Sequence, residues 1–139
     1  MYQCSVRPRS ITGDVILDEG VSTHVQSAEG IALVDSGAGP VYTSRKFALK
    51  NGYKINTDLN GKLKAARLPN GALMKPIGYI EYEMQMGQYR GIERSLVLDF
   101  DADFDIILGR HWCTKWNVVL DFANMSFTME TKAGTLKIA

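Results

Sequence analysis

The chain of 139 residues is long enough to bury a hydrophobic core without disulfides or metals, and we expect a single domain over residues 1–139. Sixteen Lys and Arg residues against fifteen Asp and Glu residues leave a formal net charge of +1, which argues against nucleic acid as a partner. No apolar run is long enough to span a bilayer, so we expect no membrane partner either.

Strand patterns dominate the chain. Apolar and β-branched runs predict strands at residues 15–17, 31–34, 72–86, 95–100, 105–108, 118–122, 126–129 and 135–138. Turn-forming residues, for example Asn70–Gly71, separate these runs. Polar and apolar side chains alternate over residues 79–86, which predicts a strand with one buried and one exposed face.

Two short helices are predicted between these strands. Thr43 or Ser44 can cap the first, which ends at Asn51–Gly52. The second follows Gly109 and runs through Lys115. With so little helix and so many short strands, the sequence predicts a mainly β domain that resembles a small barrel or folded sheet.

The most informative stretch is GIALVDSGAGPVYTS, residues 30–44, in which an apolar run ends at Asp35 among very small residues. An ionised carboxylate at the end of a buried strand is costly unless it is hydrogen-bonded or shares a proton. Gly37 allows a backbone N–H to come close, and Ser36 offers a hydroxyl for a local bond or one to another chain. From these residues alone, Asp35 is either a catalytic acid or a turn residue that bonds its own loop.

Two further motifs follow Asp35 in a fixed order. ARLPNGALMKPIGYIEYEMQMG, residues 66–87, places a tight Asn–Gly turn between long strands, so that the turn can project as a flexible arm. FDIILGRHW, residues 104–112, runs an apolar triplet into Gly109 and then opens a helix.

In this order the motifs resemble those of retropepsins, the aspartic proteases of retroviruses and long-terminal-repeat retrotransposons, with the retrotransposon forms closest in pattern. ALVDSGAG is similar to the family's active-site loop and LPNGALMKPIG to its flap. FDIILGRHW and VVLDFANMSFTM are similar to its hydrophobic-hydrophobic-Gly segment and closing strands. The match covers roughly residues 28–130 and implies a mainly β, small closed-barrel-like acid protease fold with one or two short helices. Asp–Ser–Gly alone is a weak signal, whereas the ordered set is specific.

The resemblance also implies a symmetric homodimer. Only one Asp–Ser–Gly triplet occurs here, whereas a two-lobed pepsin would need a second triplet and about twice this length. In the implied dimer, Asp35 of each subunit meets its twin on the twofold axis.

Two carboxylates so close share one proton, as is general for aspartic proteases. The ionised one takes a proton from water, which attacks the scissile carbonyl, while the protonated one donates to the oxyanion. No metal or cofactor is implied.

The resemblance assigns catalytic roles within the Asp–Ser–Gly triplet. Asp35 is the shared acid–base, and Ser36 hydrogen-bonds across the twofold axis to brace both loops. Gly37 and Ala38 keep the loop tight, and the Gly37 carbonyl contacts the substrate backbone.

The resemblance also implies a substrate-binding set. An extended peptide lies as an added strand beneath a flap whose tip is residues 68–71. Ile107 lines a substrate pocket, and Leu108 with Gly109 braces the catalytic loop from behind. The implied substrate-binding residues are Ala38, Gly39, Leu68, Pro69, Asn70, Gly71, Ile107 and Leu108.

Two positions depart from the family pattern. Many retroviral enzymes place an acid four residues after the catalytic Asp, where it pairs with an Arg, but here that position is Gly39 and Arg110 lacks this partner. Retrotransposon enzymes often carry an acid where His111 stands.

The acidic run DFDADFD, residues 99–105, invites a calcium site. An EF-hand fails because Phe104 stands where the loop needs Gly and Arg110 where it needs Glu. We instead favour an acidic loop near the substrate cleft that selects basic side chains.

The remaining candidates have plain structural interpretations. We expect Trp112 and Trp116, four residues apart, to pack one helix face onto the sheet. The basic stretch around residues 46–67 lacks interleaved aromatic residues, so we interpret it as a solvated face. The chain's His and Cys residues do not show zinc spacing: Cys4, His24, His111 and Cys113.

We therefore expect an aspartic endopeptidase that acts as a homodimer and processes a retroelement polyprotein. The alternatives are a cellular relative with host substrates and a dimeric peptide-binding module that has lost catalysis. Two distant cysteines and no evident signal peptide favour a reducing compartment, so we expect the cytoplasm or a virus-like particle.

Overall fold

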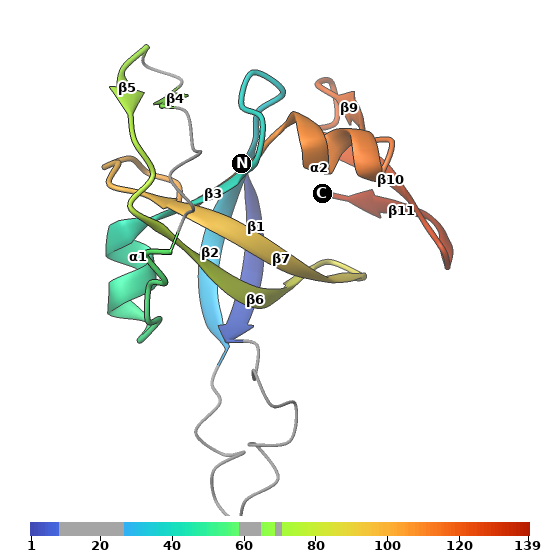
Figure 1. Cartoon of the computed structure of the whole chain (residues 1–139). Helices are drawn as coiled ribbons and strands as arrows, with labels where there is room; N and C mark the ends of the chain where they lie inside the picture. Colours follow the sequence, from blue (N-terminus) through green and yellow to red (C-terminus); the bar gives the residue numbers. More distant parts are fainter. Residues whose placement is uncertain (9–26, 59–64, 69–70) are drawn as a thin grey trace, which may run out of the picture.

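The computed structural model describes residues 1–8, 27–58, 65–68 and 71–139. The strands and helices of this part follow the chain from blue to red in Figure 1. Their bounds are β1 Tyr2–Pro8, β2 Ala28–Val34, β3 Val41–Ser44, α1 Arg45–Lys50, β4 Ala66–Arg67, β5 Leu73–Met74, β6 Gly78–Met86, β7 Tyr89–Leu98, β8 Ile106–Leu108, α2 Arg110–Lys115, β9 Val119–Asp121, β10 Ser126–Thr131 and β11 Gly134–Ile138.

Six of these strands close into a barrel in the order β1-β2-β8-β3-β7-β6. Strand β2 pairs with β8 and β3 pairs with β7 in parallel, while the other neighbours are antiparallel. A three-stranded sheet, β11-β10-β9, lies beside the barrel together with α2, and β4 and β5 form a separate pair (Figure 1). This architecture confirms the predicted mainly β, barrel-like fold with two short helices.

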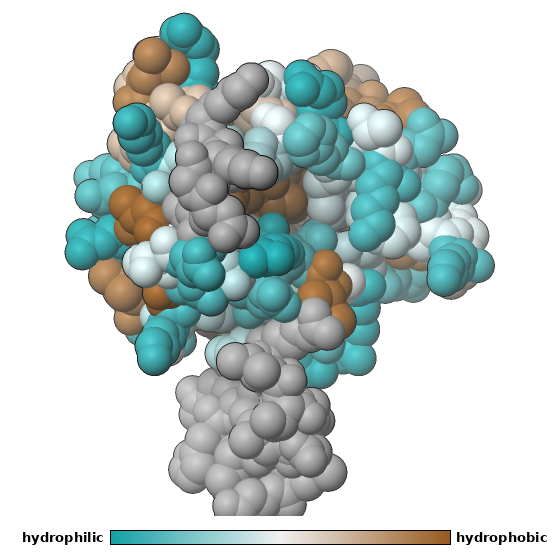
Figure 2. All heavy atoms as spheres, viewed as in Figure 1, coloured by the Kyte–Doolittle hydropathy of each residue, from teal (hydrophilic) through white to brown (hydrophobic). Residues whose placement is uncertain are grey.

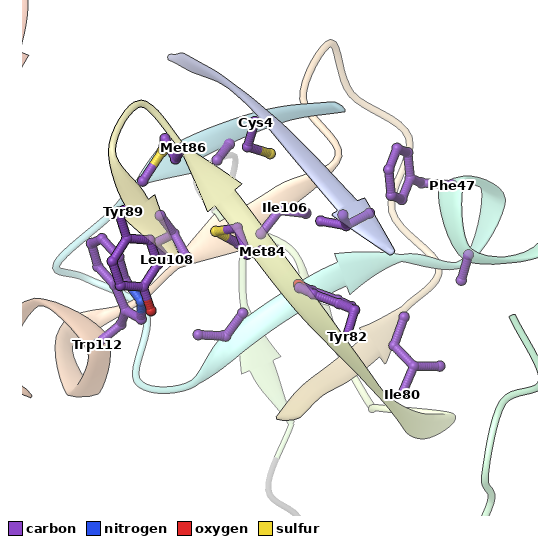
Figure 3. Packing of buried hydrophobic residues seen from close by; sticks show 14 of the residues in the cluster. Cys4, Phe47, Ile80, Tyr82, Met84, Met86, Tyr89, Ile106, Leu108 and Trp112 are labelled. Carbon is purple, nitrogen blue, oxygen red and sulfur yellow. The ribbon is translucent and has the colours of Figure 1, made fainter. Parts of the chain in front are cut away.

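The main core fills the barrel from β6. Ile80, Tyr82, Met84 and Met86 are all buried, whereas the residues between them are half-buried or exposed, which confirms the predicted alternation. Figure 3 shows Met84 near Ile106 and Leu108 of β8, and Trp112 of α2 against Tyr89 of β7. Each fully buried large apolar side chain of this kind stabilises the fold by about 1.5–3 kcal/mol.

A buried polar network joins three barrel strands. The Thr43 Oγ1 atom of β3 lies 2.6 Å from Ser95 Oγ of β7 and 2.9 Å from the Tyr82 hydroxyl of β6. All three side chains are buried. Because each hydroxyl has a partner, the network satisfies polar groups that would otherwise destabilise the core.

Both helices lie where the sequence predicts them, and local chemistry sets both ends of α1. Ser44 caps α1, since its Oγ accepts a hydrogen bond of 3.0 Å from the Phe47 N–H. The helix ends at Asn51, and Gly52 follows with a positive φ of 80°, which favours glycine. Trp112 of α2 and Trp116 at its C-cap pack edge-on against Tyr89, which confirms their packing role. Neither helix of the described part is long and apolar enough to cross a membrane.

The predicted strand over residues 72–86 is wrong in its first part. The structure has a short β5 that ends at Met74 and a separate β6 that begins at Gly78. Pro76 lies in the break, where it has no N–H to donate to a strand ladder. Strands β1 and β3 and the first half of β7 lie beyond the predicted bounds. The predicted strand at residues 15–17 lies outside the described residues.

Candidate active site

Asp35 stands where two parallel strands end at the same edge of the barrel. It follows β2, whose Val34 is paired with Leu108 of β8. The Asp35 N–H donates a 3.0 Å hydrogen bond to the Leu108 carbonyl oxygen, and the Ala38 N–H donates to the Asp35 carbonyl oxygen at 3.1 Å. These bonds fix the start of a turn over residues 35–40, which we call the Asp35 loop.

The Asp35 carboxylate is held by its own loop and is open on one side. Its Oδ1 atom accepts a 2.9 Å hydrogen bond from the Gly37 N–H, and the side chain is half-buried. A Cβ atom at position 37 would stand 3.1 Å from Oδ1, so glycine permits this close approach. Oδ2 has no hydrogen-bond partner in the described part of the chain. The carboxylate therefore has one restrained oxygen and one available oxygen.

Ser36 and Gly37 lie exposed beside this carboxylate. Within the described residues the Ser36 hydroxyl makes no hydrogen bond. The structure thus brings the three predicted catalytic residues together at the surface, with the hydroxyl free to meet another molecule.

Gly109 and the start of α2 clamp the Asp35 loop from behind. The Arg110 N–H donates to the Ala38 carbonyl oxygen at 2.6 Å, and the His111 N–H donates to that of Gly39 at 3.0 Å. A Cβ atom at Gly109 would collide with three loop carbonyl oxygens, the closest being that of Pro40. The first turn of α2 has no side-chain cap, and loop carbonyls accept hydrogen bonds from two of its N–H groups.

A second apolar cluster lies between the Asp35 loop and β4. The Ile107 side chain points into this cluster, whereas its neighbours Ile106 and Leu108 point into the main core. Leu108 therefore reaches the Asp35 loop through its carbonyl oxygen and not through its side chain. The buried members of this cluster are Ala38, Tyr42, Ala66, Leu68, Leu98, Phe100 and Ile107.

The predicted flap is a narrow hairpin of β4 and β5. Ala66 pairs with Met74 and Arg67 with Leu73. The Leu68 N–H donates to the Ala72 carbonyl oxygen at 2.8 Å, and Gly71 has a φ of 86°, which suits a glycine in a tight turn. Of the predicted tip residues, Leu68 and Gly71 are placed, whereas positions 69 and 70 (Pro69 and Asn70) lie outside the described residues.

Comparison with known proteins settles the family. A family model described as retroviral aspartyl protease matches residues 2–135. The chain belongs to this family. Among solved structures, the crystal structure of the retroviral protease-like domain of Ddi1 from Leishmania major has a TM-score of 0.55 at 15% identity, covering 81% of this chain and 86% of that one. At this identity the likeness shows the shared fold alone. No curated protein matches the chain in sequence.

The two departures from the retropepsin pattern lie against each other. A Cβ atom at Gly39 would stand 3.5 Å from Cε1 of the His111 ring, so this imidazole covers the space beside the glycine. Arg110, which lacks the family's acid partner, is exposed and forms no ion pair within the described residues. In this retropepsin-like chain, His111 therefore occupies surface beside position 39.

Cys113 of α2 is a half-buried free cysteine behind the loop of this retropepsin-like chain. Its Sγ lies 3.9 Å from the Leu108 carbonyl oxygen. Burial, and secondarily the negative charge of Asp35, raises the pKa of the Cys113 thiol. Cys113 lies one helical turn after Gly109 in the sequence. This spacing could have placed its side chain behind the Asp35 loop, because the first turn of α2 faces that loop.

Proposed function

We propose that the chain is an aspartic endopeptidase in which the Asp35 side chains of two copies activate one water molecule. The observation that carries this proposal is the Asp35 carboxylate, which stands at the surface with one oxygen unpartnered among the described residues. A chain with one such carboxylate holds half of an acid–base pair. Membership of the retroviral aspartyl protease family supports the pairing of two halves.

The chemistry follows from placing two such loops face to face. One carboxylate is protonated and the other ionised, since like charges at this distance do not both persist. The ionised carboxylate removes a proton from the water, whose oxygen bonds to the scissile carbonyl carbon. The protonated carboxylate donates to the carbonyl oxygen as it becomes an oxyanion. Proton transfer to the leaving nitrogen then breaks the peptide bond. In each copy, the Gly37 N–H orients the carboxylate.

An exposed apolar surface on β9 and the turn after it supports a second copy as the partner. Val119 is 58% exposed, Phe122 is 85% exposed and Met125 is 78% exposed, in a part of the sheet where β9 is the edge strand. We call Val119, Leu120, Phe122 and Met125 the β9 surface. Figure 1 shows β9 and the Asp35 loop at the same end of the molecule, and Figure 2 shows apolar surface there. A dimer that covers this surface removes apolar area from water.

The proposed substrate is an extended segment of a retroelement polyprotein, cut in the cytoplasm or inside a virus-like particle. The retroviral family supports this choice. A cellular protease with host substrates is the second candidate, favoured by the similar fold of the Ddi1 domain from Leishmania major.

Cleavage of a peptide library tests the proposal. Wild-type protein should cut extended peptides, statine-type inhibitors should block the cleavage, and Asp35→Asn should lower kcat/KM by roughly 10³-fold or more. Asp58→Asn is a matched control, because Asp58 is an exposed acid that is not part of the Asp35 loop. A folded dimer that binds peptides but cuts none between acidic and neutral pH would show a binding module instead of an enzyme.

A further inference from the structure

A small apolar pocket lies between the base of the flap and the loop that follows β7. Its volume is about 200 Å³. Leu68 and Met74 line it from the flap side, and Phe100 and Phe104 line it from the loop side. Figure 1 shows the loop after β7 on the same side of the molecule as β4 and β5.

The floor of this pocket continues into the cluster beneath the Asp35 loop. Leu68 and Phe100 are buried members of the cluster that also contains Ala38 and Ile107. The rings of Phe100 and Phe104 lie 5.4 Å apart between centroids. A side chain that enters the pocket therefore meets an aromatic, apolar wall that belongs to the same cluster as Ala38 of the Asp35 loop.

Two carboxylates stand at the rim of the same pocket. Asp99 and Asp101 line it and are exposed, and within the described residues neither makes an ion pair or a hydrogen bond. The flap residue Arg67 donates to the Gly71 carbonyl oxygen and not to these acids. The rim therefore carries negative charge that the described residues do not neutralise.

The four aspartates of the acidic run, residues 99–105, have different structural roles. Asp105 is structural, because its Oδ2 accepts from the Ile31 N–H at 2.9 Å and its carbonyl oxygen accepts from the Ser44 N–H at 2.8 Å. Asp103 is exposed and does not line the pocket. Within this run, Asp99 and Asp101 are the acids that combine a carboxylate without a partner among the described residues with a place on the pocket.

We propose that this pocket receives a lysine or arginine side chain of the substrate, so that cleavage selects basic residues at one position. The inference rests on the proposed protease function and names its substrate class. A long basic side chain buries its methylene stem on apolar surface and keeps its charge at the edge, which matches an apolar floor with an acidic rim. The stem also gains from contact with the aromatic wall of Phe100 and Phe104, whereas a glutamate is repelled by the rim.

Cleavage profiling of the full chain tests this assignment. Octapeptide pools carry lysine, arginine, methionine or glutamate fixed in turn at each position, and products are identified by mass spectrometry. At one position wild-type protein should prefer lysine or arginine over methionine in kcat/KM by about tenfold, the scale of a charge-assisted contact. The Asp99→Asn/Asp101→Asn variant should lose this ratio, while the Asp103→Asn control should keep it. A ratio unchanged in the double variant, or no basic preference at any position, would overturn the proposal.

A binding measurement separates this pocket from the catalytic proposal. The Asp35→Asn variant is titrated with fluorescent forms of the lysine and methionine pools, and binding is followed by anisotropy. Tighter binding of the lysine pool by about tenfold, lost in Asp99→Asn/Asp101→Asn, supports the pocket even if wild-type protein cuts no peptide. Equal binding of the two pools would contradict the pocket proposal, whether or not wild-type protein is a protease.

Discussion

At the scale of single residues, Gly109 sets the shape of the Asp35 loop. A Cβ atom there would collide with the carbonyl oxygens of Ala38, Gly39 and Pro40, which are backbone atoms and cannot rotate away. We expect Gly109→Ala to lower the free energy of unfolding by about 1–3 kcal/mol, because the loop or α2 must shift. Peptide cleavage should fall further than unfolding explains, since the shift displaces Asp35. Urea denaturation and kcat/KM measure the two effects.

Gly39→Ala is the matched control for stability. The nearest atom to its new Cβ would be Cε1 of His111 at 3.5 Å, which is an ordinary contact. The free energy of unfolding of this variant should stay within about 0.5 kcal/mol of wild type. Equal destabilisation by both substitutions would show that Gly109 has no special place behind the loop.

Single residues also show which side-chain roles could not be predicted from the sequence. Asp99, Asp101 and Asp105 look alike in an acidic run, yet one braces β2 and two stand at a pocket. The difference depends on which strands and hairpins face each carboxylate, and these neighbours are distant in sequence. The Asp–Ser–Gly loop was predictable because its small residues and apolar approach are local features.

At the scale of elements, a strand was easier to predict from the sequence when only one of its two faces is buried. Strand β6 buries one face, so its alternation was visible in the sequence. Strand β3 is buried on both faces, between β7 and β8, and it ends at the cap of α1. It therefore shows no alternation, and its Thr43 and Ser44 were interpreted only as helix caps. The local sequence pattern does not show this burial, because the strands that cover β3 are distant in sequence.

The contact between β7 and α2 contains a buried acid with a testable pH dependence. Glu93 of β7 is 6% exposed, and the Tyr89 hydroxyl donates to its Oε2 at 3.4 Å. Burial raises the pKa of Glu93 to about 7. The Trp112 indole N–H and the charge of Lys115 both lower the pKa of Glu93. The indole N–H does so without reaching hydrogen-bond geometry.

The folded chain thus holds the Glu93 proton more tightly than the unfolded chain does. The resulting stabilisation is fully present below the ordinary carboxyl pKa of 4.5 and is lost as the pH rises through about 7. The loss is no more than about 3 kcal/mol. Melting temperature should therefore fall between pH 5 and 7.5 in wild type and fall less in Glu93→Gln. Glu29→Gln, an exposed acid, should keep the wild-type slope. Parallel slopes in all three proteins would mean that Glu93 is ionised throughout.

At the scale of the whole molecule, the proposed function requires two copies of the chain, and we propose that they join through the β9 surface. Phe122→Lys removes the most exposed apolar side chain of that surface. Because Phe122 is 85% exposed, the substitution should leave the melting temperature of the monomer almost unchanged. It should raise the dissociation constant of the dimer by at least about tenfold, as expected for loss of an aromatic anchor. Sedimentation equilibrium measures this constant.

Activity should report the same event through its dependence on enzyme concentration. Below the dissociation constant, two chains must meet for each active site, so the rate should rise with the square of chain concentration. Phe122→Lys should move the change from quadratic to linear dependence to a higher concentration. Ile92→Lys is the matched control, since Ile92 is 50% exposed on β7 and lies outside the β9 surface. If Ile92→Lys weakens the dimer as much as Phe122→Lys, or if the rate stays linear at every dilution, the β9 surface is not where two copies join.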